Sequence, residues 1–236
     1  MTIGEPFAAA ARSYDPDDMR PSTRPPAPLH RASRDVVRPL PAVRDDAALL
    51  EGLRAGEPWA MAALFERYGP HVQRLLRKIL GPQPSLEIPD LIHDVFVRAL
   101  SSIGQLREPA AMLAWMQAIT TRLAYRALTA QRARRWLRFW EPVELVTLAA
   151  PAVETEVLDA YRRTYAVLER MPVGERIVFT LRYIDGMELS PIAVACEVSL
   201  ATVKRRLARA SQRFASAAQR DEVLRTWLQE GNRWTT

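Results

Sequence analysis

Apolar residues recur at helical spacing from about residue 45 to residue 220, whereas the alternation typical of strands is almost absent. The pattern predicts helices over 45–56, 59–68, 71–80, 90–100, 110–138 and 156–170, separated by glycine- and proline-containing breaks. In the second of these helices Leu64, Phe65 and Tyr68 are expected to face inward, and Gly69-Pro70 is expected to end it. The sequence therefore predicts an all-α fold.

Residues 190–214 carry two short helical patterns that meet at a tight break. Ser190-Pro191 is a typical helix start, because a hydroxyl caps free N–H groups and proline fits the first turn. Ser199 starts a second helix, in which Val203, Leu207, Ala210 and Phe214 form one apolar stripe. Two helices joined by so short a break are typical of a helix-turn-helix motif.

Cations occupy the other faces of the second helix, and no acid occurs between Ser199 and Phe214. This pattern favours a recognition helix that enters the major groove of DNA, over a merely solvated basic face. The residues predicted to contact DNA from this helix are Ser199, Thr202, Lys204, Arg205, Arg206, Arg209 and Arg213.

The long helix predicted over 110–138 is apolar in its first half and rich in arginine in its second half. Guanidinium groups with interleaved aromatic rings suit phosphates and unstacked bases. The alternative is that some of these rings pack in the domain core. The residues predicted to bind single-stranded nucleic acid are Arg122, Tyr125, Arg126, Arg132, Arg134 and Arg135.

Charge supports a polyanionic partner. The 236-residue chain has a formal net charge of +6 and is 48% hydrophobic, with a sequence pI near 10.0. The single cysteine, Cys196, excludes an internal disulfide and suits a reducing cytoplasm, where we expect the protein to act. No apolar run approaches the roughly 20 residues that span a membrane, so no direct membrane insertion is expected.

The spacing of helices and prolines predicts two small helical domains joined by a flexible linker. A proline-rich, disordered extension is expected over 1–43, helical domains over 44–138 and 156–220, a linker over 139–155 and a C-terminal tail over 221–236. The linker spans at most roughly 55 Å when extended, which exceeds one DNA turn of about 34 Å. The two domains can therefore grip separated sites.

Candidate chemistry is sparse. Asp90, His93 and Asp94 share one helix at i, i+3 and i+4, but no second ligand-bearing helix accompanies them, so surface charge is favoured over a metal site. No order of histidine with serine or cysteine indicates a nucleophile. The sequence predicts that the protein is not an enzyme and has no cofactor, metal or small-molecule substrate.

Two segments resemble one known family. ALFERYGPHVQRLLRKIL, DLIHDVFVRAL and AWMQAITTRLAYRALTAQRARR are similar to the second region of bacterial RNA polymerase sigma factors of the extracytoplasmic-function (ECF) type. MPVGERIVFTLRYIDGMELSPIAVACEVSLATVKRRLARASQRF is similar to their fourth region. Together the segments cover roughly residues 45–138 and 156–214 in the family's order.

The resemblance implies a promoter-specificity subunit that binds core RNA polymerase and promoter DNA and helps to melt the promoter. It assigns docking on the coiled coil of the largest polymerase subunit to Asp90, His93, Asp94 and Arg98. It places a pocket for a flipped −10 base in 101–109, reading of the −10 element on the long helix and reading of the −35 element on the helix-turn-helix. An anti-sigma partner is also implied.

The chain departs from the family pattern at several positions. Histidine replaces glutamine at His93, Arg122 and Arg126 stand where asparagine and aspartate are common, and Glu197 stands where glycine is usual in the turn. A left-handed conformation at Glu197 would cost on the order of 1–2 kcal/mol. Two alternatives stay open: a helix-turn-helix repressor or activator, and a sigma-like regulator that binds polymerase without opening promoters.

Overall fold

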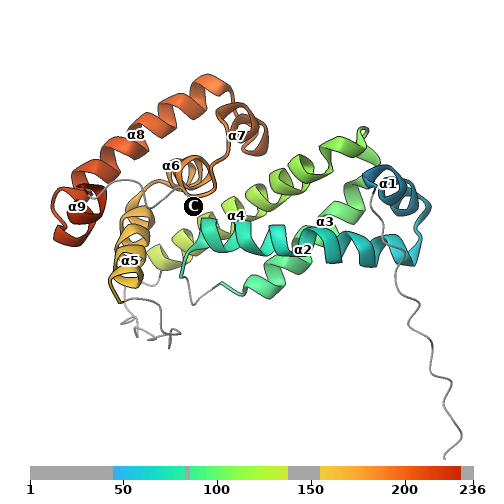
Figure 1. Ribbon diagram of the computed structural model, residues 1–236, viewed down its shortest axis with the longest axis horizontal. Helices are drawn as coiled ribbons and strands as arrows, with labels where there is room; N and C mark the ends of the chain where they lie inside the picture. The colour runs from blue at the N-terminus through green and yellow to red at the C-terminus, as the bar shows by residue number, and fades with distance from the viewer. Residues whose placement is uncertain (1–44, 83–85, 138–154, 230–236) are drawn as a thin grey trace, which may run out of the picture. The chain divides into compact units, whose positions relative to one another are not determined.

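The protein is described by a computed structural model, which covers residues 45–82, 86–137 and 155–229 (Figure 1). The proposed extension over 1–43 and linker over 139–155 lie outside these residues, apart from the linker's last residue. Residues 1–39 and 40–236 separate into two units, and all the described residues belong to the second.

Helices and short helical turns make up the regular structure of the described residues, which contain no strand, as the apolar spacing predicted. The elements of the first half are α1 (Asp46–Ala55), α2 (Pro58–Leu80), α3 (Ile88–Ser102), η1 (Ile103–Gln105), η2 (Pro109–Ala111) and α4 (Met112–Leu137). Those of the second half are α5 (Thr155–Arg170), α6 (Val173–Phe179), the π-helical turn η3 (Thr180–Ile184), α7 (Leu189–Ala195), α8 (Leu200–Ala218) and α9 (Glu222–Gln229).

Helices α2, α3 and α4 lie side by side and form the frame of the first half (Figure 1). Their inward faces bury large apolar side chains, among them Leu64, Leu76, Val95 and Ile119. Burial of about 25 cal/mol per Å² of apolar surface drives this packing. The rigid frame fixes the exposed faces of α3 and α4, which carry the predicted contact residues.

Two sequence predictions fail in α2. The helix runs through Gly69-Pro70 without a break, so the proline costs one backbone hydrogen bond but does not end the helix. Tyr68 and Leu64 are buried as predicted, whereas the side chain of Phe65 is 55% exposed. Phe65 instead packs against Phe96 of α3, with ring centroids 4.9 Å apart and the ring planes tilted by 49°.

The second half has its own small core. Tyr165, Leu168, Phe179, Phe214 and Leu224 pack together between α5, α6, α8 and α9. The predicted tail over 221–236 therefore contains a helix, α9, which begins after a turn at the end of α8.

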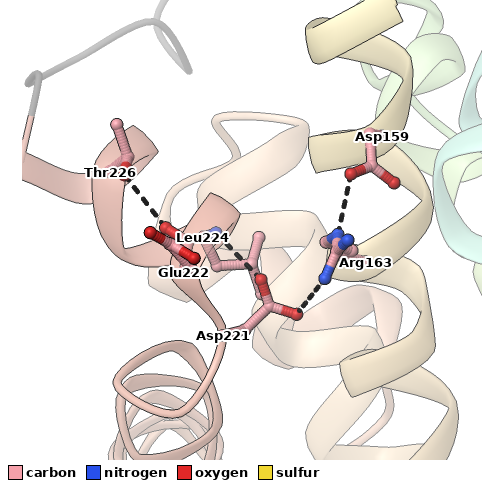
Figure 2. Close-up of polar contacts among 6 residues, drawn as sticks. All are labelled: Asp159, Arg163, Asp221, Glu222, Leu224 and Thr226. Atoms are coloured by element: carbon pink, nitrogen blue, oxygen red, sulfur yellow. Dashed lines mark hydrogen bonds and ion pairs between the residues drawn. The ribbon is translucent and has the colours of Figure 1, made fainter.

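Figure 2 shows how α9 is attached to α5. Arg163 of α5 donates hydrogen bonds to Asp159 (2.8 Å) and to Asp221 (3.0 Å), the residue before α9. The other carboxylate oxygen of Asp221 accepts the backbone N–H of Leu224 and so caps α9. Burial alone would raise the pKa of Asp221, but the bonds from Arg163 and from the backbone outweigh it and hold that pKa below its usual value.

Candidate nucleic-acid interface

The helix-turn-helix motif is formed by α7, a short turn and α8. Ser199 caps α8: its hydroxyl oxygen accepts the backbone N–H of Thr202 at 3.2 Å, as predicted for a helix start there. The first helix begins at Leu189, one residue before the predicted start at Ser190. The apolar stripe is confirmed, because Val203, Ala210 and Phe214 are buried.

The turn contains a strained residue. Glu197 has φ 53°, and it is the only non-glycine residue with positive φ in the part of the chain that the structure describes. Its backbone N–H donates to Val194, and that of Val198 donates to Ala193, so the end of α7 is closed by the turn. The turn keeps the usual left-handed geometry with a glutamate in place of the usual glycine.

Several candidate residues on α8 are open to solvent. Lys204, Arg205 and Arg209 are exposed, as is Ser199, while Thr202 is half-buried. At the N-terminal half of a recognition helix, such side chains reach base edges and phosphates. Nothing in the described residues covers this part of the helix with an acidic side chain.

The two flanking arginines of α8 contact α6. Arg213 Nε lies 2.9 Å from the carboxylate oxygen Oε2 of Glu175, which is itself buried. Half-buried Arg206 lies against Gly174, so close that a Cβ there would be 3.1 Å from its guanidinium carbon. These two cations therefore help to fix α8 on α6 and are held in defined positions.

An arginine-lined groove of about 530 Å³ lies between α5 and the C-terminal half of α8. Arg209 and Arg213 belong to the predicted set, whereas the sequence reasoning missed Arg170 and Arg220. The signal for Arg220 was available, because Arg209, Arg213 and Arg220 stand at i, i+4 and i+11, which share one face at helical spacing. Arg170 comes from another helix, and only the fold brings it to the groove.

The residues of α4 that are predicted to bind single-stranded nucleic acid lie on more than one face of the helix. Tyr125, Arg126, Arg132 and Arg134 are exposed, and Arg122 is half-buried; of the side chain of Arg135 nothing is described. At 100° per residue, Arg134 lies about 160° round the helix from Arg132. The structure brings Arg122, Tyr125, Arg126 and Arg132 to one side of the helix.

Two of these arginines have partners in the second half of the chain. Arg122 Nη1 lies 2.6 Å from Glu197 Oε1 in the turn of the helix-turn-helix. Arg132 Nη1 donates a hydrogen bond of 2.9 Å to the carbonyl oxygen of Met171. Trp115, by contrast, packs against the core.

The exposed face of α3 carries Asp90, His93, Asp94 and Arg98. His93 Nδ1 lies 3.8 Å from Asp94 Oδ1, a contact between two largely exposed side chains. Within the described ranges, no three His, Cys, Asp or Glu side chains come together as metal ligands.

Two apolar residues beside this face were missed. Val97 of α3 is 51% exposed, and Phe65 of α2 is exposed where its ring packs against Phe96 of α3. Apolar side chains framed by charges are typical of protein contact surfaces. Of the segment 101–109, residues 101–102 end α3, Ile103–Gln105 form η1 and residues 106–108 form a short loop before η2, fixed by a hydrogen bond from Arg54 to the carbonyl oxygen of Leu106.

The other candidate reactive group is Cys196, a half-buried thiol at the end of α7. Burial raises its pKa to about 11, although nearby Arg206 opposes the shift. The thiol is therefore protonated at neutral pH, which agrees with a packing role. None of the described helices is long and apolar enough to cross a membrane.

Comparisons with known proteins agree with this geometry. The family model "Sigma-70 region 2" matches residues 64–134, and "Sigma-70, region 4" matches residues 161–214. The ECF RNA polymerase sigma-E factor of Escherichia coli K12 is 24% identical over 183 residues, which cover 74% of this chain and 94% of that protein. The protein of the same name from Haemophilus influenzae is 25% identical over 183 residues, 74% of this chain and 95% of that protein.

A solved structure of CnrH in complex with the cytosolic domain of CnrY shares the fold with a TM-score of 0.51 and 21% identity. The match covers 75% of this chain and 99% of that one. The two sigma-70 regions occur here in the family's order, on the α2–α4 frame and on the helix-turn-helix half. The chain therefore belongs to the sigma-70 family of RNA polymerase sigma factors, in its ECF branch.

Proposed function

We propose that this chain directs core RNA polymerase to specific promoters and helps to open them, with the work divided between its two halves. The observation that carries the proposal is the pair of basic surfaces on α4 and α8, each on the segment matched by one of the two sigma-70 regions. Residues 44–138 hold polymerase and the −10 element, and residues 156–220 hold the −35 element. The protein contributes binding rather than bond-making chemistry.

The −35 element is read by α8. Arg205 and Arg209 are exposed on the face opposite the buried stripe and make the base contacts or the neighbouring phosphate contacts, with Ser199 and Thr202 at the helix start. Lys204 contacts a phosphate. Arg206 and Arg213, which are held by α6, also contact phosphates and thereby orient the helix on the DNA. Arg170 and Arg220 extend the phosphate contact along the α5–α8 groove.

The −10 element and its opened strand are held by α4. Tyr125 offers an exposed ring on which an unstacked base stacks, and Arg126 and Arg132, on the same side of the helix, neutralise backbone phosphates around it. Arg134 and Arg135 add positive charge further along the helix. Arg122 belongs to the same side of the helix. Arginine instead of shorter polar residues at positions 122 and 126 favours phosphate binding over base discrimination.

Polymerase docks on the exposed face of α3. Asp90 and Asp94 pair with basic residues of the coiled coil of the largest subunit, while Arg98 and His93 flank them. Phe65 and Val97 supply the apolar centre of this contact. The likeness to CnrH, solved with the cytosolic domain of CnrY, supports an anti-sigma factor as a further partner.

The decisive experiment is in vitro transcription with core polymerase and a library of genomic promoter fragments. We expect run-off transcripts from a small subset of fragments, dependent on this protein. Core binding without any transcript would identify a competitor for polymerase instead of an initiation factor. DNA binding as a dimer without core binding would identify a conventional helix-turn-helix regulator.

The docking surface is tested with paired variants. Phe65→Ser and Val97→Ser should weaken core binding about tenfold or more, since buried apolar contacts dominate such interfaces. Leu113→Ser is the matched control, because Leu113 is 40% exposed on α4. Equal core affinity for all three variants would place the docking surface elsewhere.

A further inference from the structure

The groove between α5 and the C-terminal half of α8 concentrates positive charge in a hollow of about 530 Å³. Arg170 lines it from α5, and Arg209, Arg213 and Arg220 line it from α8 and the turn that follows. None of the described residues that line the groove is acidic. Cations held this close repel one another, and a bound anion relieves the repulsion.

The guanidinium groups of this groove are available to a ligand. Arg170, Arg209 and Arg220 are exposed, and in the part of the chain that the structure describes their side chains have no acidic partner. Arg213 contacts the buried carboxylate of Glu175 through its Nε, but its side chain is still 58% exposed and its Nη groups remain for another acceptor. Glu175 therefore holds Arg213 in place before any ligand arrives.

The groove also has an apolar lining. Met171 is buried, and Val167 and Ala217 are half-buried, so apolar side chains form the deeper part of the hollow. Ser216 and Gln212 add a hydroxyl and an amide that hydrogen-bond to polar groups of a ligand. Sites for small ligands combine such an apolar lining with a few polar groups, in cavities of roughly 300–1,000 Å³.

An apolar lining beside four guanidinium groups suits a ligand with a ring at one end and several negative charges at the other. A nucleotide with two or three phosphates has this form, because guanidinium groups bind phosphate oxygens in pairs and the base covers the apolar surface. The backbone of duplex DNA fits the hollow less well. Each of its phosphates carries a single charge, and its bases are stacked inside the helix.

We propose that this groove binds a nucleoside di- or triphosphate, and that the bound nucleotide competes with promoter DNA. The four arginines of the groove are also proposed contacts to −35 DNA, so a nucleotide that occupies them withdraws them from the promoter. Nucleotide binding itself is independent of the proposed function, whereas the competition rests on the proposed role of α8.

Nucleotide binding is tested on the full chain without DNA, by equilibrium dialysis of radiolabelled ATP and GTP at one fixed salt concentration. We expect saturable binding of one nucleotide per chain, and an affinity about tenfold lower for the monophosphates, which carry less charge. Inorganic triphosphate has the charge but no ring and should bind about tenfold more weakly than ATP. Equal affinity for inorganic triphosphate and ATP would overturn the assignment to a nucleotide.

Two matched pairs of variants locate the site. Ser216→Glu places a negative charge in the groove and should weaken ATP binding about tenfold or more, whereas Gln219→Glu makes the same change on an exposed residue outside the groove. Arg170→Ala should also weaken binding about tenfold, and Arg162→Ala, at an exposed arginine of α5 that does not line the groove, should not. Equal losses within each pair would show attraction to charge without a site. Circular dichroism confirms that every variant retains its helices.

Competition is measured with a mixed-sequence DNA duplex of about 30 base pairs at constant ionic strength. ATP at about ten times its own Kd should raise the apparent Kd of the duplex about tenfold in the parent, and should have little effect on Ser216→Glu. An unchanged duplex Kd, in a protein that binds both ligands, would overturn the competition. If the duplex does not bind while the nucleotide results hold, the proposed role of α8 fails and the nucleotide site stands.

Discussion

The guanidinium group of Arg176 donates a hydrogen bond of 2.7 Å to the carbonyl oxygen of Leu80, the last residue of α2. It also donates to Ile79, so one buried side chain satisfies two backbone groups that the helix itself leaves unpaired. The stability of the first half of the chain is thereby coupled to the second.

Removal of this side chain should be costly. Arg176→Ala leaves two buried carbonyl groups unsatisfied and opens a cavity, and we expect the free energy of unfolding to fall by about 3 kcal/mol. Urea denaturation followed by circular dichroism measures the loss.

Arg176→Lys is the matched control for the hydrogen bonds. It keeps the charge but cannot reproduce the fork that reaches both carbonyls, so about half of the loss should remain. Equal stability of Arg176→Lys and the parent would show that charge alone matters at this position.

The strained turn gives a second prediction. Glu197 has φ 53°, and glycine tolerates this conformation without steric cost, so Glu197→Gly should be more stable than Glu197→Ala by about 1 kcal/mol. Both variants lose the ion pair with Arg122, which cancels in the comparison. Thermal unfolding of the two variants measures the difference, and a more stable alanine variant would contradict the strain at this residue.

The recognition helix should make two kinds of DNA contact, one to bases and one to phosphates. Arg205→Ala should relax sequence preference at one −35 position, with a discrimination loss of about 1–3 kcal/mol if its contact to the base is bidentate. Lys204→Ala should weaken binding to all sequences and reduce the salt slope by about one counterion.

Competitive binding of holoenzyme to a randomised −35 library, repeated at several salt concentrations, distinguishes the two effects. Gln219→Ala is a suitable control, since Gln219 is exposed at the end of α8 and does not line the arginine groove. If both variants lose affinity equally for all −35 sequences, Arg205 contacts a phosphate and not a base.

The attachment of α9 should depend on pH. The folded-state pKa of Asp221 is depressed, so its contribution to stability is present above the unfolded-state pKa of about 3.9 and is lost as the pH falls through the folded-state value. Asp221→Ala removes both the cap and the pair with Arg163 and should cost about 1 kcal/mol at neutral pH.

Hydrogen exchange of the α9 amides at pH 7 and at pH 3 measures this dependence. The difference between the parent and Asp221→Ala should shrink at the lower pH. Asp221→Asn is the control, because asparagine still caps a helix but carries no charge, so its protection should not follow the titration of the Asp221 carboxylate. An unchanged difference at pH 3 would show that the carboxylate charge has no role.

Much of the second half was predictable from local pattern. The apolar stripe of α8 and the cap at Ser199 follow from spacing and from one hydroxyl, and both are present. The left-handed residue of the turn, Glu197, was identified by its position in the motif, although glutamate is not a residue type that indicates this conformation. Local signals succeed here because a cap and a stripe involve residues within a few positions of one another.

The failures in α2 have a tertiary cause. Gly69-Pro70 is a sound break signal in isolation, but packing of α2 against α3 and α4 outweighs the loss of one backbone hydrogen bond. Phe65 is apolar and therefore was expected inside, yet it lies exposed on Phe96 at the edge of the frame.

The sequence by itself determined the all-α class, the helix-turn-helix, the basic faces and the resemblance to the ECF sigma factors. Each of these depends only on residue types and on their spacing over short stretches of the chain. Only the tertiary structure decided that Arg170 joins the groove of α8 and that Arg122 meets Glu197. It alone showed that Tyr165 and Arg176 cap α2. The partners in that cap are backbone carbonyls, which every residue possesses, so no pattern of side chains could have marked them in advance.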